Sequence, residues 1–194
     1  MYQELHSWVR DYIDNYCIIR GANLPGKKPG TKYSWMFYLR RGLFNHEFLS
    51  AVSQMFCIKI QEEVKHFNFQ LAGLETASTP MLAGIPLVAR VYGLDLNAFS
   101  VRAERKTYGL KNWFEGLPNE KPVLMVDDLC NSAISMRRCY DLLTQHNIPV
   151  LDYAFVIVNK TEKQFNNNTD KYLPNHIKMI SLFNLDDFGL GLPL

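Results

Sequence analysis

The sequence lacks several features that would assign a function at once. Its four cysteines, Cys17, Cys57, Cys130 and Cys139, lie far apart without a CxxC pair, and its five histidines are scattered. Neither the ligand spacing of a zinc site nor a dense disulfide framework is therefore present. We expect reduced thiols in an intracellular protein.

The chain also lacks an excess of either charge and any long apolar run. It has 21 Lys and Arg against 19 Asp and Glu, and the two signs are interleaved, so charge alone indicates no nucleic-acid partner. The N-terminal stretch MYQELHSWVRDYID carries charges throughout, unlike a signal peptide, and no run approaches the length of a membrane span. We expect a soluble, cytoplasmic protein that does not bind membranes.

What is present suffices for one folded unit, because 47% of the 194 residues are hydrophobic. Residues 2–19 have a helical pattern. The Gly, Pro and Lys content of the next stretch, GANLPGKKPGTK, predicts an exposed loop that separates an N-terminal appendage from the rest. Apolar residues from Phe48 to Phe67 recur at three- and four-residue steps, which indicates an amphipathic helix.

Beyond that helix, strand patterns alternate with helix patterns. We predict strands in FQLAGL, NAFSV, KPVLMV and VLDYAFVIV, and helices in TPMLAGIPLVARVYG and SMRRCYDLLTQHN. Strands that are apolar on both faces and alternate with helices indicate an α/β fold with a mainly parallel sheet flanked by helices. Ligands of such sheets bind beyond the carboxyl ends of the strands.

Two adjacent carboxylates lie at one of these ends. In VLMVDDLCNSAIS, Asp127 and Asp128 follow the apolar run VLMV. Side-by-side carboxylates repel each other unless an outside ligand uses them. Ribose hydroxyls, or Mg²⁺ with its waters, suit acceptor-only oxygen groups of this kind.

The residues after the acidic pair suggest a phosphate site. Asn131 to Ser135 (NSAIS) lead into a helix and offer backbone N–H groups and two hydroxyls at its N-terminus. The simpler interpretation is that Asp128, Asn131 or Ser132 only caps that helix.

Several segments carry a resemblance to a known family. VLMVDDLCNSAIS resembles the phosphoribosyl-pyrophosphate motif of type I phosphoribosyltransferases. VRAERKTYGLKNWFEG (101–116) is similar to the flexible loop of orotate phosphoribosyltransferases, and LAGLETASTPMLAG (71–84) to the strand and turn around the pyrophosphate. PGTKYSWMFYLRRGLFN resembles the segment that lies over the base, and SLFNLDDFGL a tail found in several relatives.

The resemblance implies an enzyme, a glycosyltransferase that uses Mg²⁺ and phosphoribosyl pyrophosphate to attach ribose 5-phosphate to a pyrimidine-like base such as orotate. It implies the type I phosphoribosyltransferase fold, with a helix and a small hood in residues 1–40 and the α/β core and tail in residues 41–194. It also implies a cytoplasmic homodimer of nucleotide metabolism, in pyrimidine biosynthesis.

Site residues follow from the same resemblance. Asp127 and Asp128 match the acidic pair that holds the ribose hydroxyls and works with magnesium, and Asn131, Ser132, Ala133, Ile134 and Ser135 match the loop around the 5-phosphate. Arg102 and Lys106 match cations that neutralise the pyrophosphate, Lys106 from a loop that reaches into the neighbouring subunit's site. Glu75 and Thr76 match the turn near the pyrophosphate.

Five positions depart from the family pattern. Ala133 and Ile134 replace residues that are commonly Gly and Gly or Thr, and Ala77 replaces a common Gly in the pyrophosphate turn. In the flexible loop, Ala103 replaces a second Lys and Tyr108 replaces His. Glycine permits a positive φ and a close approach to phosphate, which a β-branched residue resists. A binding or regulatory protein that has lost turnover, and a phosphoribosyltransferase for a different base, therefore stand beside the orotate-type enzyme.

Overall fold

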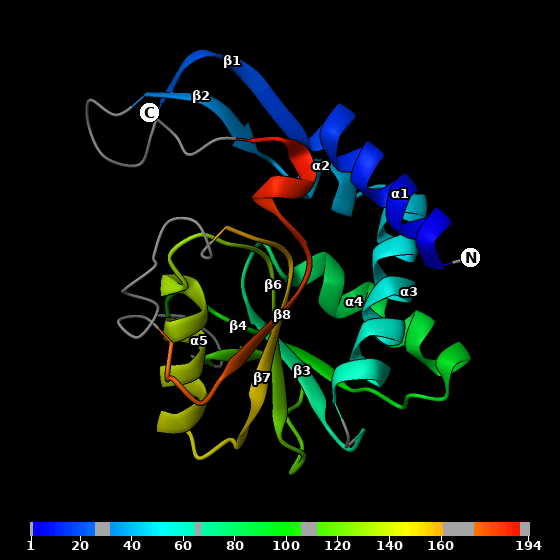
Figure 1. The fold of residues 1–194 in the computed structure, drawn as a ribbon. Helices are drawn as coiled ribbons and strands as arrows, with labels where there is room; N and C mark the ends of the chain where they lie inside the picture. The colour runs from blue at the N-terminus through cyan, green and yellow to red at the C-terminus, as the bar shows by residue number, and fades with distance from the viewer. Residues whose placement is uncertain (1, 26–31, 65–66, 106–111, 161–172, 191–194) are drawn as a thin grey trace.

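A six-stranded sheet forms the centre of the protein in a computed structural model that describes residues 2–25, 32–64, 67–105, 112–160 and 173–190 (Figure 1). The strands lie in the order β5-β4-β3-β6-β7-β8, and every neighbouring pair is parallel except β4 and β5. Their bounds are β3 Gln70–Leu74, β4 Ala98–Val101, β5 Phe114–Glu115, β6 Val123–Cys130, β7 Val150–Asn159 and β8 Lys178–Asn184. The predicted α/β fold with a mainly parallel sheet is confirmed.

Helices cover both faces of this sheet. Helices α1, α3 and α4 lie on one face and α5 on the other (Figure 1). Their bounds are α1 Tyr2–Tyr12, α3 His46–Glu63, α4 Thr79–Ala89 with a 3₁₀ turn η2 at Arg90–Tyr92, and α5 Ile134–Gln145. The helices predicted in these regions are therefore present, and Asn45 caps α3 by accepting hydrogen bonds from the N–H groups of Glu47 and Phe48.

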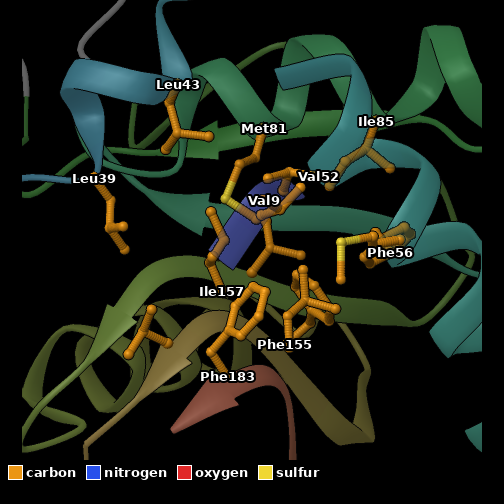
Figure 2. Packing of buried hydrophobic residues seen from close by; sticks show 14 of the residues in the cluster. Val9, Leu39, Leu43, Val52, Phe56, Met81, Ile85, Phe155, Ile157 and Phe183 are labelled. Atoms are coloured by element: carbon orange, nitrogen blue, oxygen red, sulfur yellow. The ribbon is translucent and has the colours of Figure 1, made fainter. Parts of the chain in front are cut away.

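The central strands bury both of their faces, as their continuous apolar sequence predicts. Because successive side chains point to opposite faces, Phe155 and Ile157 of β7 join the α3 and α4 side, whereas Ala154 and Val156 join the α5 side. Figure 2 shows the first cluster, in which Phe155 and Ile157 lie below Val52 and Met81.

The N-terminal region differs from its prediction. Helix α1 ends at Tyr12, a π-helical turn η1 spans Ile13–Cys17, and strand β1 runs over Ile18–Pro25, so the predicted helix over 2–19 is too long. β1 pairs antiparallel with β2, Lys32–Phe37, in a separate two-stranded sheet, which we call the hood together with the short helix α2, Arg40–Leu43. The ladder extends the strand into the predicted loop 21–32, of which residues 26–31 lie outside the described part.

The C-terminal segment connects the hood to the main sheet. After β8 the chain forms the 3₁₀ turn η4, Leu185–Phe188, which lies beneath the hood in Figure 1. The ring of Phe188 packs against Phe37 of the hood at a centroid distance of 5.4 Å and against Phe183 of β8 at 5.7 Å. This tail therefore fixes the hood above one end of the sheet.

We predict that Phe188→Ala will lower the free energy of unfolding by about 3 kcal/mol, because it removes a buried ring between two packed elements. Chemical denaturation measures this value. Phe44→Ala is the matched control, since Phe44 is 77% exposed and its loss creates no cavity. Equal effects of the two substitutions would contradict the proposed role of the tail.

Candidate functional site

The polar residues singled out in the sequence gather where the parallel strands end. Strand β6 continues through Asp127 and Asp128 to Cys130, four residues beyond the predicted strand, because the ladder with β7 persists to the pair Cys130–Asn159. The acidic pair thus lies inside the last part of the strand, and the turn to α5 is shorter than the sequence suggested.

The acidic pair is largely removed from solvent. Asp127 is only 7% exposed, and its Oδ1 accepts a hydrogen bond from the backbone N–H of Asp128 at 2.9 Å. Burial raises the pKa of both carboxyl groups, the neighbouring Asp128 raises the pKa of Asp127 further, and the charge of Arg40 in α2 lowers that of Asp128. A cation bound here would offset both the burial and the repulsion.

Close packing brings the neighbouring strand against this pair. A Cβ added to Gly73 of β3 would lie 2.3 Å from the carbonyl oxygen of Val126 and 2.5 Å from Cβ of Ser78. No larger residue fits without displacement of the backbone. Glycine at this position therefore allows the turn after β3 to lie close to Val126, the residue directly before the acidic pair.

The turn after β6 has the geometry of an anion site. Ala133 has a φ of 54°, the left-handed conformation that usually favours glycine, and it is the N-cap residue of α5. No side chain accepts a capping hydrogen bond from the start of α5. The interpretation of Asp128, Asn131 or Ser132 as the helix cap is therefore wrong. The first N–H groups of α5 are left without a side-chain cap at the helix's positive end.

The other residues predicted for this loop surround that end. Asn131, Ile134 and Ser135 are exposed, and Ser132 is half-buried. Ile134, at 55% exposure, begins α5 and does not carry the positive φ of the turn, which falls on Ala133. The β-branched residue thus leaves the conformation of the turn intact.

The turn after β3 holds the foot of the segment that follows β4. Oε1 of Glu75 accepts a hydrogen bond from the N–H of Ala103 at 3.2 Å. Nη1 of Arg102 lies 2.8 Å from Oε1 of Glu115 and 3.7 Å from Oε2 of Glu75. Thr76 is exposed beside Glu75, and Lys106 and Tyr108 lie outside the described residues. Arg102 is therefore positioned by two carboxylates.

Sequence reasoning missed Lys160. This residue is only 9% exposed, burial lowers its pKa, and its Nζ lies 4.7 Å from the ring centroid of Trp35 in the hood. Within the described residues no carboxylate forms an ion pair with it. Its backbone N–H donates to the carbonyl oxygen of Cys130, so it directly follows β7 at the edge that carries the acidic pair. A lysine directly after a predicted buried strand was the available signal.

Cys130 itself has a structural role. Burial raises the pKa of its thiol to about 11, which disfavours the thiolate that a nucleophile requires. All four cysteines are buried and free, as expected for reduced thiols.

The donor set fits a bound divalent cation that shares its coordination with a substrate. In the described part of the chain, no group of three or more His, Cys, Asp or Glu residues could hold a metal by itself. Magnesium, however, commonly uses one or two carboxylates and completes its shell with water and substrate phosphates. Asp127 and Asp128 would supply those two carboxylates, beside the uncapped N-terminus of α5, so the site needs no third acid.

Comparison with known proteins finds similarity to an orotate phosphoribosyltransferase in sequence. No protein-family model matches the chain. The orotate phosphoribosyltransferase of Methanocaldococcus jannaschii is 27% identical over 134 residues, which cover 69% of this chain and 70% of that protein.

Solved structures of orotate phosphoribosyltransferases are similar to this chain as well. The Mycobacterium tuberculosis orotate phosphoribosyltransferase in complex with Fe(III) dicitrate matches with a TM-score of 0.77 at 16% identity, over 96% of this chain and 99% of that one. The chain has the type I phosphoribosyltransferase fold. A complex of the M. tuberculosis enzyme with 5-phospho-α-D-ribosyl 1-diphosphate matches with a TM-score of 0.65 at 16% identity, over 97% and 91% of the two chains. The resemblance to type I phosphoribosyltransferases, and to the orotate enzymes among them, is confirmed at low identity.

Within this phosphoribosyltransferase fold, we predict that Ala133→Gly will stabilise the protein by about 1 kcal/mol, because it relieves the cost of a left-handed alanine. It will also strengthen phosphate binding by making the turn easier to form. Thermal unfolding and calorimetric titration with inorganic phosphate measure the two effects.

Asn147→Gly is the matched control for this prediction. Asn147 also has a positive φ, 57°, but it lies after the opposite end of α5. It should change stability without changing phosphate affinity. Phosphate affinity that responds equally to both substitutions would contradict a role for the Ala133 turn.

Proposed function

We propose that the protein transfers ribose 5-phosphate from phosphoribosyl pyrophosphate to a pyrimidine-like base, orotate in the first instance, with Mg²⁺. The observation that carries this proposal is the pair of buried Asp127 and half-buried Asp128 next to an uncapped helix N-terminus. The similarity to orotate phosphoribosyltransferases, one of which is solved with 5-phospho-α-D-ribosyl 1-diphosphate, supports it.

The acidic pair and the turn that follows it bind different parts of the sugar phosphate. Asp127 and Asp128 accept hydrogen bonds from the ribose hydroxyls and hold the magnesium, which when bound would neutralise charge on the pyrophosphate. The turn from Asn131 to Ser135 binds the 5-phosphate with the backbone N–H groups that α5 leaves free.

The leaving pyrophosphate requires positive charge. Its departure from the anomeric carbon creates an oxocarbenium-like sugar and a polyanion, so cations placed near the anion lower the barrier. Arg102 supplies one such charge. Glu75 and Thr76 line the turn after β3, next to Arg102. The role of Lys106, and the homodimer in which it would serve the neighbouring subunit's site, rest on the family resemblance.

The hood supplies the base side of the site. Trp35 and Lys160 form a cation–π pair at the carboxyl edge of the sheet. A buried ammonium without a carboxylate partner among the described residues favours a ligand with carbonyl or carboxylate oxygens. Orotate carries both groups, which is why we place it ahead of other bases.

A binding or regulatory protein without turnover is the second candidate. The favouring observation is that Arg102 is paired with Glu115 at 2.8 Å, while Ala103 brings no second cation. Positive charge for the pyrophosphate is therefore reduced, whereas the acidic pair and the phosphate turn remain.

Calorimetric titration with phosphoribosyl pyrophosphate, with and without Mg²⁺, followed by a pyrophosphate-release assay with orotate and a panel of other bases, tests these proposals. Magnesium-dependent binding with release in the presence of orotate supports the enzyme. Binding without release from any base would leave the regulatory protein, and release with another base only would change the acceptor. Absence of binding would contradict both candidates.

We predict that Asp128→Asn will weaken magnesium-dependent binding of phosphoribosyl pyrophosphate by about tenfold or more, because it removes a charged acceptor. Its melting temperature should be unchanged or higher, since the substitution also removes repulsion from Asp127. Asp152→Asn, at an exposed position on β7, is the control. A large loss of stability together with unchanged affinity would make Asp128 a structural residue.

We predict that Lys160→Met will raise the KM for orotate by about tenfold or more, because it removes the buried cation while preserving the aliphatic volume. Affinity for phosphoribosyl pyrophosphate should remain within about twofold. Lys178→Met is the control, since Lys178 is exposed on β8 and pairs with Glu63. An unchanged KM for orotate would remove Lys160 from base recognition.

A further inference from the structure

Ala103 is held from both sides of its backbone by charged side chains of the candidate site. Its N–H donates to Oε1 of Glu75 at 3.2 Å. Its carbonyl oxygen accepts hydrogen bonds from Nε of Arg138 at 3.0 Å and from Nη2 of the same guanidinium. The orientation of this residue is therefore fixed by the turn after β3 on one side and by α5 on the other.

Arg138 thus connects two parts of the site that are distant in sequence. It lies in the second turn of α5, the helix whose N-terminus forms the proposed phosphate site. Ala103 directly follows Arg102, whose own backbone N–H donates to the carbonyl oxygen of Trp113 at 2.9 Å. Residues 102 and 103 are consequently attached both to Trp113, which directly precedes β5, and to α5.

We propose that Arg138 is a positioning residue that directs Arg102 toward the pyrophosphate. The inference rests on the proposed function and extends it to a residue outside the motifs. A guanidinium that donates twice to one carbonyl makes a charge-assisted contact, which defines the peptide plane better than a single neutral hydrogen bond does. That carbonyl belongs to the peptide group between Ala103 and Glu104, and Nε of Arg102 donates to the carbonyl oxygen of Glu104 at 3.3 Å. By holding this segment, Arg138 restricts the direction of the Arg102 side chain.

The chain provides a matched control next to Arg138. Arg137 has the same side chain, the same helix and a similarly exposed position, but its Nε donates to Asp141 one turn further along α5, at 2.8 Å. Removal of Arg137 therefore deletes an equal charge near the phosphate turn without releasing Ala103. Any difference between the two variants reports on the contact with Ala103.

The experiment compares wild type, Arg138→Ala, Arg138→Lys and Arg137→Ala in steady-state assays with orotate and in calorimetric titrations with magnesium pyrophosphate. For Arg138→Ala we expect kcat to fall about fivefold or more and pyrophosphate affinity to fall about as much, with the KM for orotate unchanged. Arg138→Lys, which keeps the charge but offers one donor nitrogen in place of two, should be intermediate, and Arg137→Ala should remain within about twofold of wild type.

Equal kcat and equal pyrophosphate affinity in the two alanine variants would overturn the inference, as would an effect confined to melting temperature. Wild-type protein that binds magnesium pyrophosphate but releases none from its substrate would overturn the proposed function instead. In that case the titrations decide the inference separately: weaker pyrophosphate binding in Arg138→Ala than in Arg137→Ala supports it, and equal binding rejects it.

Discussion

The constraint on which the candidate site depends is the placement of two adjacent carboxylates, buried Asp127 and half-buried Asp128, at the end of a central strand. A parallel sheet makes this possible, because its strands end at one edge, where helix N-termini and turns supply polar groups. The cost appears in the raised pKa of both Asp127 and Asp128, which means that the protein does not fully compensate their charge. The charge of Arg40, from the hood, and the backbone N–H groups of Asp128 and Leu129 act against it without cancelling it. A bound cation and the hydroxyl groups of a sugar would stabilise these two charges better than the surrounding protein groups do.

The hood and the tail complete that environment. The Phe37, Phe188 and Phe183 rings form a continuous contact from the hood to β8, and Trp35 packs edge-on against Phe37. Trp35 in turn lies beside Lys160 at the carboxyl edge. A two-stranded sheet is marginal by itself in water, so these contacts explain how it holds an aromatic face above the site. In the function we propose, the base side would thereby be built by the N-terminal hood and the sugar-phosphate side by the end of β6 and the turn to α5.

Most of the central sheet could be predicted from sequence because buried parallel strands have continuous apolar runs between helical patterns. The end of β6 could not, since Asp127 and Asp128 resemble a loop in composition, although the ladder with β7 continues through them. The strand β1 was hidden for a related reason: its Gly, Asn and Pro residues indicate a turn, and only the pairing with β2 makes it a strand. Lys160 was missed because a single lysine after a strand is ordinary until the hood places Trp35 over it. The individual roles of the site residues remain predictions from the resemblance.

The departures from the family pattern affect two kinds of group differently. At the phosphate turn the ligand would be held by backbone N–H groups, and Ala133 adopts the left-handed conformation despite its Cβ, so the arrangement of donors survives the loss of glycine at a modest energetic cost. At the pyrophosphate the ligand would be held by side-chain charge, which a backbone conformation cannot replace. Ala103 supplies none, and Arg102 is shared with Glu75 and Glu115. In the function we propose, binding of the sugar phosphate would therefore be the more robust property of this site. Turnover would depend on how completely Arg102 leaves its carboxylate partners for the departing anion.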